Sequence, residues 1–159
     1  MTVNLTKNGL REIANSFDLF YIDIWGVLHN GIKLNQDAVD VLFQLEKLGK
    51  KYVLLTNAPR PNSDVAKFLE KLGLDNIKSS KVYTSGQCSL NYLSNEKKNL
   101  KFFHLGPERD MNLFKNFKSL KQNKVEEADY IICTGLFDEH EGLEFYKKFL
   151  FPFKNKEMV

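Results

Sequence analysis

Two apolar segments of the chain are each followed at once by polar residues that could take part in chemistry. The first segment, FDLFYI, leads into Asp23, and the second, KYVLL, leads into Thr56 and Asn57. Burying a carboxylate at the end of an apolar strand is costly unless a metal, a cation or backbone donors compensate its charge. A hydroxyl and a carboxamide at a strand end can donate hydrogen bonds to a phosphate. Taken singly, Asp23 could equally cap the turn that follows it, and Thr-Asn before Ala-Pro is ordinary loop sequence.

The surrounding pattern predicts the elements that would position these residues. Apolar runs predict strands near residues 17–25, 51–55, 81–84, 100–105 and 129–134. Between and after them, capping residues and apolar periodicity predict helices over 36–48, 63–72, from 85 past 93, from 107 past 117, and over 141–150. Strands separated by single helices need crossover connections, so we expect a parallel α/β sheet. Ligands bind such sheets at the carboxyl ends of the strands, where Asp23, Thr56 and Asn57 fall.

The order of several motifs resembles the haloacid dehalogenase (HAD) superfamily. The motifs are FYIDIWGVLHNG, then YVLLTNAPRP, then KVYTSGQCSLNYL. The resemblance is closest to the class IIA capped branch, which includes nucleotide and sugar-phosphate phosphatases, and FFHLGPERDMNLF and EEADYIICTGL resemble the first strands of its cap. It implies a Rossmann-like parallel sheet, with residues 1–95 forming part of the HAD-like core domain and residues 96–159 forming the first half of an α/β cap.

The resemblance also implies a role for each residue at the strand ends. Asp23 matches the nucleophile that attacks phosphorus and forms an aspartyl-phosphate. The Asp23 carboxylate and the backbone carbonyl of Trp25 match ligands of a Mg²⁺ cofactor, a hard cation that prefers oxygen. Thr56 matches the hydroxyl that binds the transferring phosphoryl group, and Asn57 matches its neighbour. The implied substrate is a small phosphorylated metabolite.

Trp25 departs from the family pattern, because phosphatases of the superfamily normally carry a second Asp at this position. That Asp protonates the leaving oxygen and then activates water, whereas an indole has only an N–H to donate. The chain resembles a subgroup that has the same Asp-x-Trp-Gly-Val pattern. His29 could replace the missing acid/base if it folds back over the site, or it could be an exposed histidine in a turn.

A second departure concerns the family's third and fourth motifs, which lie C-terminal to the cap. They supply a Lys and one or two Asp, and this sequence contains no Gly-Asp-x-x-x-Asp. We therefore expect the N-terminal part of a longer protein, whether an expressed fragment, an early stop or a split gene. Two functions stay open: Mg²⁺-dependent phosphoryl transfer that is inactive in this chain alone, or a non-catalytic phosphate-binding or protein-interaction module. A C-terminal complementing fragment or a homo-oligomer is the expected protein partner.

The composition excludes or disfavours several other classes of protein. With 159 residues, 43% hydrophobic and 13% aromatic, the chain can form a core, so disorder is excluded. No apolar run approaches ~18 residues and no signal peptide is evident, which predicts a cytoplasmic protein that does not span a membrane. The net charge is +3 with scattered lysines, which argues against nucleic-acid binding. The Phe-rich segment 145–153 is expected to form an apolar surface.

Overall fold

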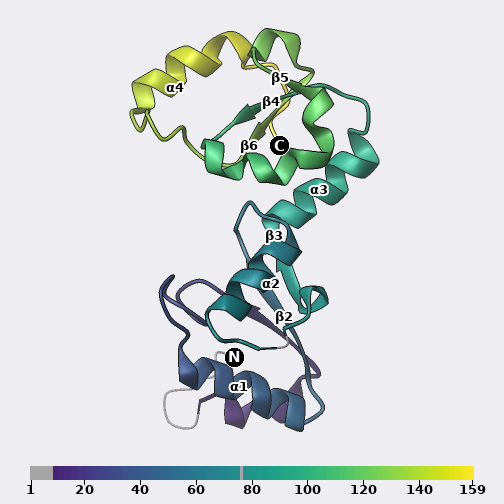
Figure 1. The fold of residues 1–159 in the computed structure, drawn as a ribbon, viewed down its shortest axis with the longest axis vertical. Coiled ribbons are helices and arrows are strands. Elements are labelled where there is room, and N and C mark those ends of the chain that lie inside the picture. Colours follow the sequence, from purple (N-terminus) through teal and green to yellow (C-terminus); the bar gives the residue numbers. More distant parts are fainter. Residues whose placement is uncertain (1–8, 76) are drawn as a thin grey trace. The chain divides into compact units, whose positions relative to one another are not determined.

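The structure is a computed structural model that describes residues 9–75 and 77–159, and it contains two compact units (Figure 1). The first unit combines the chain up to Asn57 with Asn62–Thr84, and the second combines Ala58–Pro61 with Ser85–Val159. The chain therefore passes from one unit to the other after Asn57, after Pro61 and after Thr84. The boundary predicted between residues 95 and 96 lies further along the chain, at the end of a helix that belongs to the second unit.

The first unit is a three-stranded parallel sheet with two crossover helices. After two short 3₁₀ helices, its elements are β1 (Leu19–Asp23), α1 (Gln36–Lys47), β2 (Lys51–Thr56), α2 (Asn62–Lys71) and β3 (Val82–Thr84). The strand order is β1-β2-β3, with Asp23 opposite Leu55 and Thr56 opposite Thr84. The predicted parallel α/β sheet is confirmed, and the predicted strands and helices of this unit agree with the observed bounds to within a few residues.

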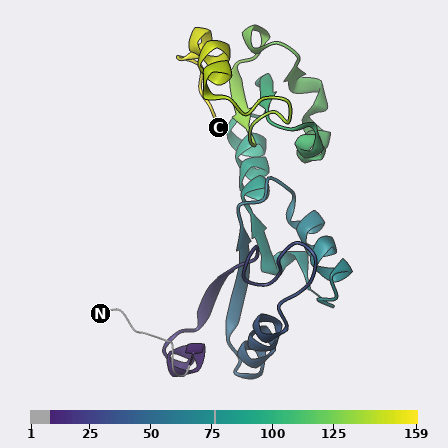
Figure 2. The same cartoon turned by 90° about the vertical axis from the view of Figure 1, so that its left-hand side faces the viewer.

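One face of this sheet is covered by helices. Successive right-handed crossovers in one direction place their helices on the same face, and Figure 2 shows α1 and α2 on one side of the strands. The covered side holds the buried core, which consists of Val39, Leu42 and Leu45 of α1, Val65, Ala66 and Leu69 of α2, and Tyr52, Leu54 and Val82 of the sheet. Gly49 and Gly73 end the two helices at positive φ, which glycine adopts without strain.

The second unit is another three-stranded parallel sheet, with order β5-β4-β6. Its main elements are α3 (Ser85–Glu96), β4 (Phe102–Leu105), η4 (Glu108–Leu120), β5 (Lys121–Gln122), β6 (Tyr130–Cys133) and α4 (Leu143–Leu150). The helix predicted from Pro107 is the 3₁₀ helix η4, which is kinked at Phe114. Beyond β6, Met158 forms a parallel bridge with Ile131.

Apolar clusters cover both faces of the second sheet, because neighbouring residues of a strand point to opposite sides. On one side Phe102 and Tyr130 pack with Leu93 and Phe114. The other side contains Leu105, Val125, Ile131 and Tyr146, packed against Phe103, Phe137, Phe145, Phe149, Leu150 and Phe153. The expectation that 145–153 forms an apolar surface is thus wrong for most of its aromatic rings, since these rings complete the core and Phe151 alone among the segment's phenylalanines is strongly exposed.

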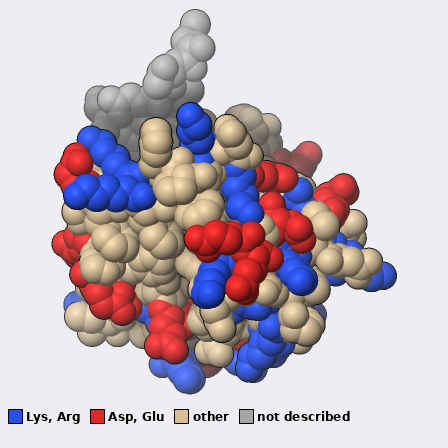
Figure 3. All heavy atoms as spheres, turned by 90° about the horizontal axis from the view of Figure 1, so that it is seen from above, with Lys and Arg blue, Asp and Glu red and all other residues tan. Residues whose placement is uncertain are grey.

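The surface carries charges of both signs. On the face seen in Figure 3, Lys and Arg side chains alternate with Asp and Glu side chains, and an uncharged area lies to one side. Of the helices within residues 9–75 and 77–159, none is both long and apolar enough to cross a bilayer.

Candidate active site

Asp23 is the last residue of β1 and lies at the carboxyl edge of the first sheet. Its Oδ1 accepts a hydrogen bond of 2.8 Å from the backbone N–H of Ile24. The same N–H donates to the carbonyl of Leu55 in β2 at 3.1 Å. The carboxylate is solvent-exposed, and this shared amide fixes its orientation beside the end of the neighbouring strand.

Thr56 ends β2 directly beside this point, and Asn57 follows it. Because β1 and β2 are parallel, the predicted placement of Asp23 and Thr56 at the same edge of adjacent strands is confirmed. The structure adds Thr84, the last residue of β3, which is opposite Thr56 and almost fully buried. The backbone N–H of Thr84 donates to the Asn62 side chain at 3.0 Å. Its position at the end of the strand predicted over 81–84 is the sequence signal that could have identified a third polar residue at this edge.

The turn after Asp23 exposes Trp25. Ile24 and Leu28 are buried and anchor the turn, and the Ile24 carbonyl accepts the Leu28 N–H at 2.8 Å. Gly26 adopts φ +77°, a conformation that disfavours other residues, and its N–H donates to the His29 carbonyl at 2.8 Å. These hydrogen bonds fix the backbone on both sides of Trp25, and the Trp25 side chain is 65% exposed.

The backbone carbonyl of Trp25 takes no part in the bridge that this turn makes. Trp25 and His29 form an isolated parallel bridge, whose two hydrogen bonds run from Gly26 to His29 and from His29 to Ile24. The bridge therefore uses the Gly26 N–H and the Ile24 carbonyl, and not the Trp25 carbonyl. An exposed carboxylate with a nearby carbonyl is the kind of oxygen set that suits Mg²⁺.

His29 is not an exposed turn residue, so that alternative is wrong. Its side chain is only 6% exposed, and its ring packs edge-to-face on Phe68 with centroids 5.3 Å apart. Nδ1 accepts a 2.8 Å hydrogen bond from the Gly31 N–H, which leaves the proton of the neutral ring on Nε2. Burial lowers the pKa of His29 below its usual value and keeps the ring neutral. Only Nε2 is left to exchange a proton.

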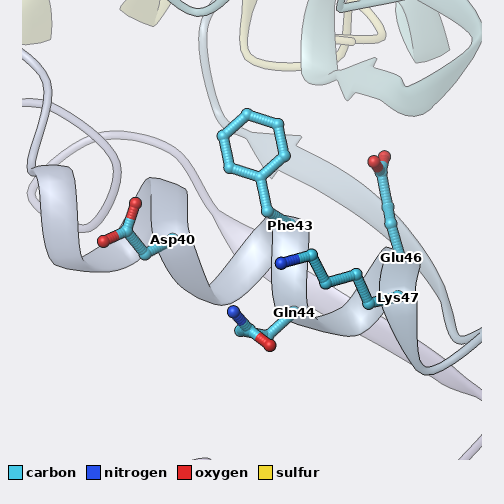
Figure 4. Close-up of a pocket in the computed structure, with 5 residues that line it drawn as sticks. All are labelled: Asp40, Phe43, Gln44, Glu46 and Lys47. Atoms are coloured by element: carbon cyan, nitrogen blue, oxygen red, sulfur yellow. The ribbon is translucent and has the colours of Figure 1, made fainter.

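A pocket beside the turn that follows Asp23 is lined by Gly26, Val27, His29 and Asn30 together with residues 33–37. Within the part of the chain that the structure describes, no three His, Cys, Asp or Glu side chains lie close enough together to hold a metal ion. A pocket along α1 is lined by Asp40, Phe43, Gln44, Glu46 and Lys47 (Figure 4), none of which belongs to the candidate site.

A parallel α/β sheet with Asp at the carboxyl end of one strand and Thr-Asn at the end of the next is the arrangement that the HAD resemblance implies. The sequence model of haloacid dehalogenase-like hydrolases matches residues 20–118. The chain therefore belongs to the haloacid dehalogenase-like hydrolase family, which confirms the expectation from its motifs. None of the curated proteins matches it.

Solved structures of several members of this fold are similar over nearly the whole chain. A haloacid dehalogenase-like hydrolase from Brucella suis is 28% identical, with a TM-score of 0.76 over 92% of this chain and 55% of its own. A 4-nitrophenylphosphatase from Thermotoga maritima is 22% identical, with a TM-score of 0.68 over 92% of this chain and 55% of its own. NagD from Escherichia coli K-12 is 22% identical, with a TM-score of 0.61 over 88% of this chain and 54% of its own. The chain thus spans about half the length of these relatives.

Proposed function

We propose that this chain carries the nucleophile and part of the phosphate-binding site of a phosphoryl-transfer enzyme that acts on a small phosphorylated metabolite. The observation that supports it best is the position of Asp23, exposed at the carboxyl edge of the sheet beside Thr56, in a chain of the haloacid dehalogenase-like hydrolase family. The 4-nitrophenylphosphatase among its structural neighbours supports the same class of reaction.

The proposed step is an in-line displacement at phosphorus. A carboxylate oxygen of Asp23 forms the new P–O bond, and the bond from phosphorus to the leaving oxygen breaks. Thr56 and Asn57 donate hydrogen bonds to the phosphoryl oxygens, and as neutral groups they do so without quenching the nucleophile. The Ile24 amide holds Asp23 in place during the attack. Asp23 and the Trp25 carbonyl would bind Mg²⁺, which would supply positive charge to offset the repulsion between carboxylate and phosphate.

Trp25 restricts which phosphates can react. A plain ester needs a proton on its leaving oxygen, and an indole cannot supply one near neutral pH. An acyl phosphate releases a carboxylate, which is stable without that proton. We therefore expect this chain to react with activated phosphates once, and to show negligible turnover of ordinary phosphate esters.

Covalent labelling tests the proposal without requiring turnover. The protein is incubated with acetyl phosphate and Mg²⁺, and intact-mass and peptide mass spectrometry then locate the label. We expect one phosphoryl group on Asp23, none in Asp23→Asn, and an unchanged label in Asp18→Asn, a control at another exposed aspartate just before β1. An unlabelled wild-type protein, or a label that survives in Asp23→Asn, would refute the proposal that Asp23 is the nucleophile.

A second candidate is a non-catalytic module that binds phosphate or another protein through the same edge. Trp25 in place of an acid/base favours it, as does the lack of a three-ligand metal cluster among the described residues. This module would bind inorganic phosphate, detected by chemical-shift changes at Thr56 and Asn57, and would remain unlabelled by acetyl phosphate.

A further inference from the structure

The pocket beside the turn after Asp23 has no part in the proposed reaction. Its volume is about 430 Å³. Its walls come from the turn and from the start of α1, namely Gly26, Val27, His29, Asn30 and residues 33–37. Asp23, Thr56 and Asn57 are not among these residues. Pockets of this size hold small organic molecules, and the groups that line them determine which class of molecule binds.

The buried ring of His29 supplies one unused donor to this pocket. His29 is 6% exposed, and its Nδ1 accepts the Gly31 N–H, so the proton of the neutral ring is on Nε2. Nε2 has no hydrogen-bond partner among the described residues, although each of their side-chain nitrogen and oxygen atoms that is closed off from solvent has one. The Nε2–H therefore reaches accessible space, and the pocket that His29 lines provides it.

The first turn of α1 offers further unused donors to the same pocket. The first hydrogen bond of this 12-residue helix runs from the Val39 N–H to the Asn35 carbonyl at 3.1 Å. The amides of Gln36 and Asp37 precede it and have no acceptor in the described part of the chain. Asn35 does not cap them, because its Nδ2 donates instead to the Val27 carbonyl at 3.3 Å. Free amides at the positive end of a helix favour an anion.

Two charges of opposite sign complete the lining. Lys33 and Asp37 are both exposed, and neither forms an ion pair with the other or with another described residue. An anion in the pocket is attracted by Lys33 and repelled by Asp37, and the repulsion grows with the charge of the anion. The lining therefore favours an anion with a single negative charge over a dianion such as phosphate.

We propose that this pocket binds the carboxylate of a small organic acid. A carboxylate carries one negative charge, and its two oxygens can accept hydrogen bonds from the His29 Nε2–H and from the amides at the start of α1. Lys33 supplies the opposite charge, and Asp37 disfavours phosphate. The pocket shares no residue with the proposed nucleophile and phosphate-binding groups, so this site can exist whether or not Asp23 is a nucleophile.

NMR titration of the ¹⁵N-labelled chain with sodium propionate tests the proposal. We expect saturable shifts of the Gln36 and Asp37 amides and of the His29 ring. Propionamide has the same shape without the charge, and it should leave these signals unchanged at equal concentration, as should inorganic phosphate at a pH where it is a dianion. An equal response to propionamide, or a stronger one to phosphate, overturns the proposal. Propionate shifts confined to Thr56 and Asn57 also overturn it, because the carboxylate would then occupy the candidate active site.

Charge variants at the mouth of the pocket sharpen the test. Lys33→Met should weaken propionate binding by about 5-fold, the upper range for an exposed charge pair. Lys47→Met makes the same change in the last turn of α1, outside this pocket, and should leave binding unchanged. Asp37→Asn should strengthen propionate binding and let phosphate shift the same amides, because the repelling charge is gone. Wild-type affinity in both Lys33→Met and Asp37→Asn would overturn the proposal.

A variant of His29 tests the buried donor. His29→Asn keeps an acceptor for the Gly31 N–H and removes the Nε2–H, so propionate binding should weaken by about 10-fold. The dispersion of its amide signals shows whether this variant folds. If it does not fold, the Lys33 and Asp37 variants decide the outcome. Unchanged propionate affinity in a folded His29→Asn would overturn the proposal, because the buried donor would then take no part in binding.

Discussion

Trp25 decides how the candidate site differs from that of an ordinary phosphatase. Formation of an aspartyl-phosphate requires geometry, a metal and a good leaving group, and none of these involves a proton from Trp25. Breakdown of the aspartyl-phosphate requires an activated water, and the indole cannot take a proton from it. In the proposed reaction we therefore expect Trp25, whose side chain is 65% exposed, to slow the second half more than the first.

We predict that phosphorylated Asp23 is long-lived and that Trp25→Asp shortens its lifetime by up to ~10²-fold, if the new carboxylate reaches the water. Trp25→Phe is the control and should leave the lifetime unchanged. Decay of the labelled protein, followed by intact mass after removal of acetyl phosphate, measures it. Equal decay in Trp25→Asp and wild type would mean that another group already acts as base, and His29 would be the first residue to examine.

We expect His104 in β4 to make the free energy of unfolding depend on pH. Its Nε2 lies 2.8 Å from Thr134 Oγ1, its ring packs on Phe114, and the side chain is 6% exposed. Burial lowers the pKa of His104 below 6.5; nearby Asp110 raises it and Lys121 lowers it to a smaller degree. The unfolded chain therefore protonates His104 at a higher pH than the folded chain does. The stability that neutral His104 contributes above pH 6.5 is lost as the pH falls through the folded pKa of His104.

Urea unfolding at pH ~7.5 and ~5.5, on either side of the usual histidine pKa, tests this effect. We predict that wild type loses more unfolding free energy between the two values than His104→Gln, which keeps a donor for Thr134. His140→Gln, at an exposed histidine of the same unit, should behave as wild type. An equal loss in wild type and His104→Gln would assign the pH dependence to other groups, with buried His29 the next candidate.

At the scale of elements, Gly86 allows the loop Ala58–Pro61 to pack against the first turn of α3. Its N–H donates to the Ala58 carbonyl at 3.1 Å, and a Cβ built on it would lie 2.3 Å from the backbone nitrogen of Arg60. We predict that Gly86→Ala lowers the free energy of unfolding by about 1–3 kcal/mol, because backbone on both sides must move. Gly142→Ala meets nothing within 4 Å and is the control. Denaturant unfolding of both variants measures the difference, and equal stabilities would show that the loop moves away at little cost.

The sequence predicted those helices and strands whose pattern depends only on neighbouring residues. Apolar runs and glycine stops predicted β1, α1, β2 and α2, and the parallel strand order follows from their crossovers. The 3₁₀ geometry of η4 and the two-residue strand β5 could not be predicted, because short elements depend on packing against β4 instead of on their own periodicity. The unit boundary after Thr84 likewise depends on packing, since Leu93 of α3 belongs to the core of the second unit.

The same distinction between local pattern and distant packing applies to the residues of the candidate site. Asp23, Thr56 and Asn57 were predictable because strand ends at one edge of a parallel sheet must meet. The burial of His29 was not predictable, because it depends on Phe68, which is distant in sequence and packs against the ring only after α2 docks. Nor could the 67% exposure of Tyr21 be predicted from sequence, since Tyr21 lies in a run that is typical of a strand buried on both sides.

At the scale of the whole molecule, the chain matches only part of the length of its relatives. This chain spans about 55% of the length of the relatives whose fold it shares, and its described residues contain no group of three His, Cys, Asp or Glu side chains that could hold a metal ion. Charge stabilisation by such groups is usually the largest contribution to phosphoryl transfer, and removing one preorganised donor alone costs about 10²–10³-fold in rate.

We therefore predict that the chain alone hydrolyses p-nitrophenyl phosphate, or a panel of phosphorylated metabolites in Mg²⁺, at rates far below the ~10 s⁻¹ that is typical of enzymes. Asp23→Asn is the control, and any residual rate that it leaves unchanged comes from a contaminant. Turnover near ~10 s⁻¹ by the chain alone, abolished by Asp23→Asn, would show that the groups on this sheet edge are sufficient for catalysis.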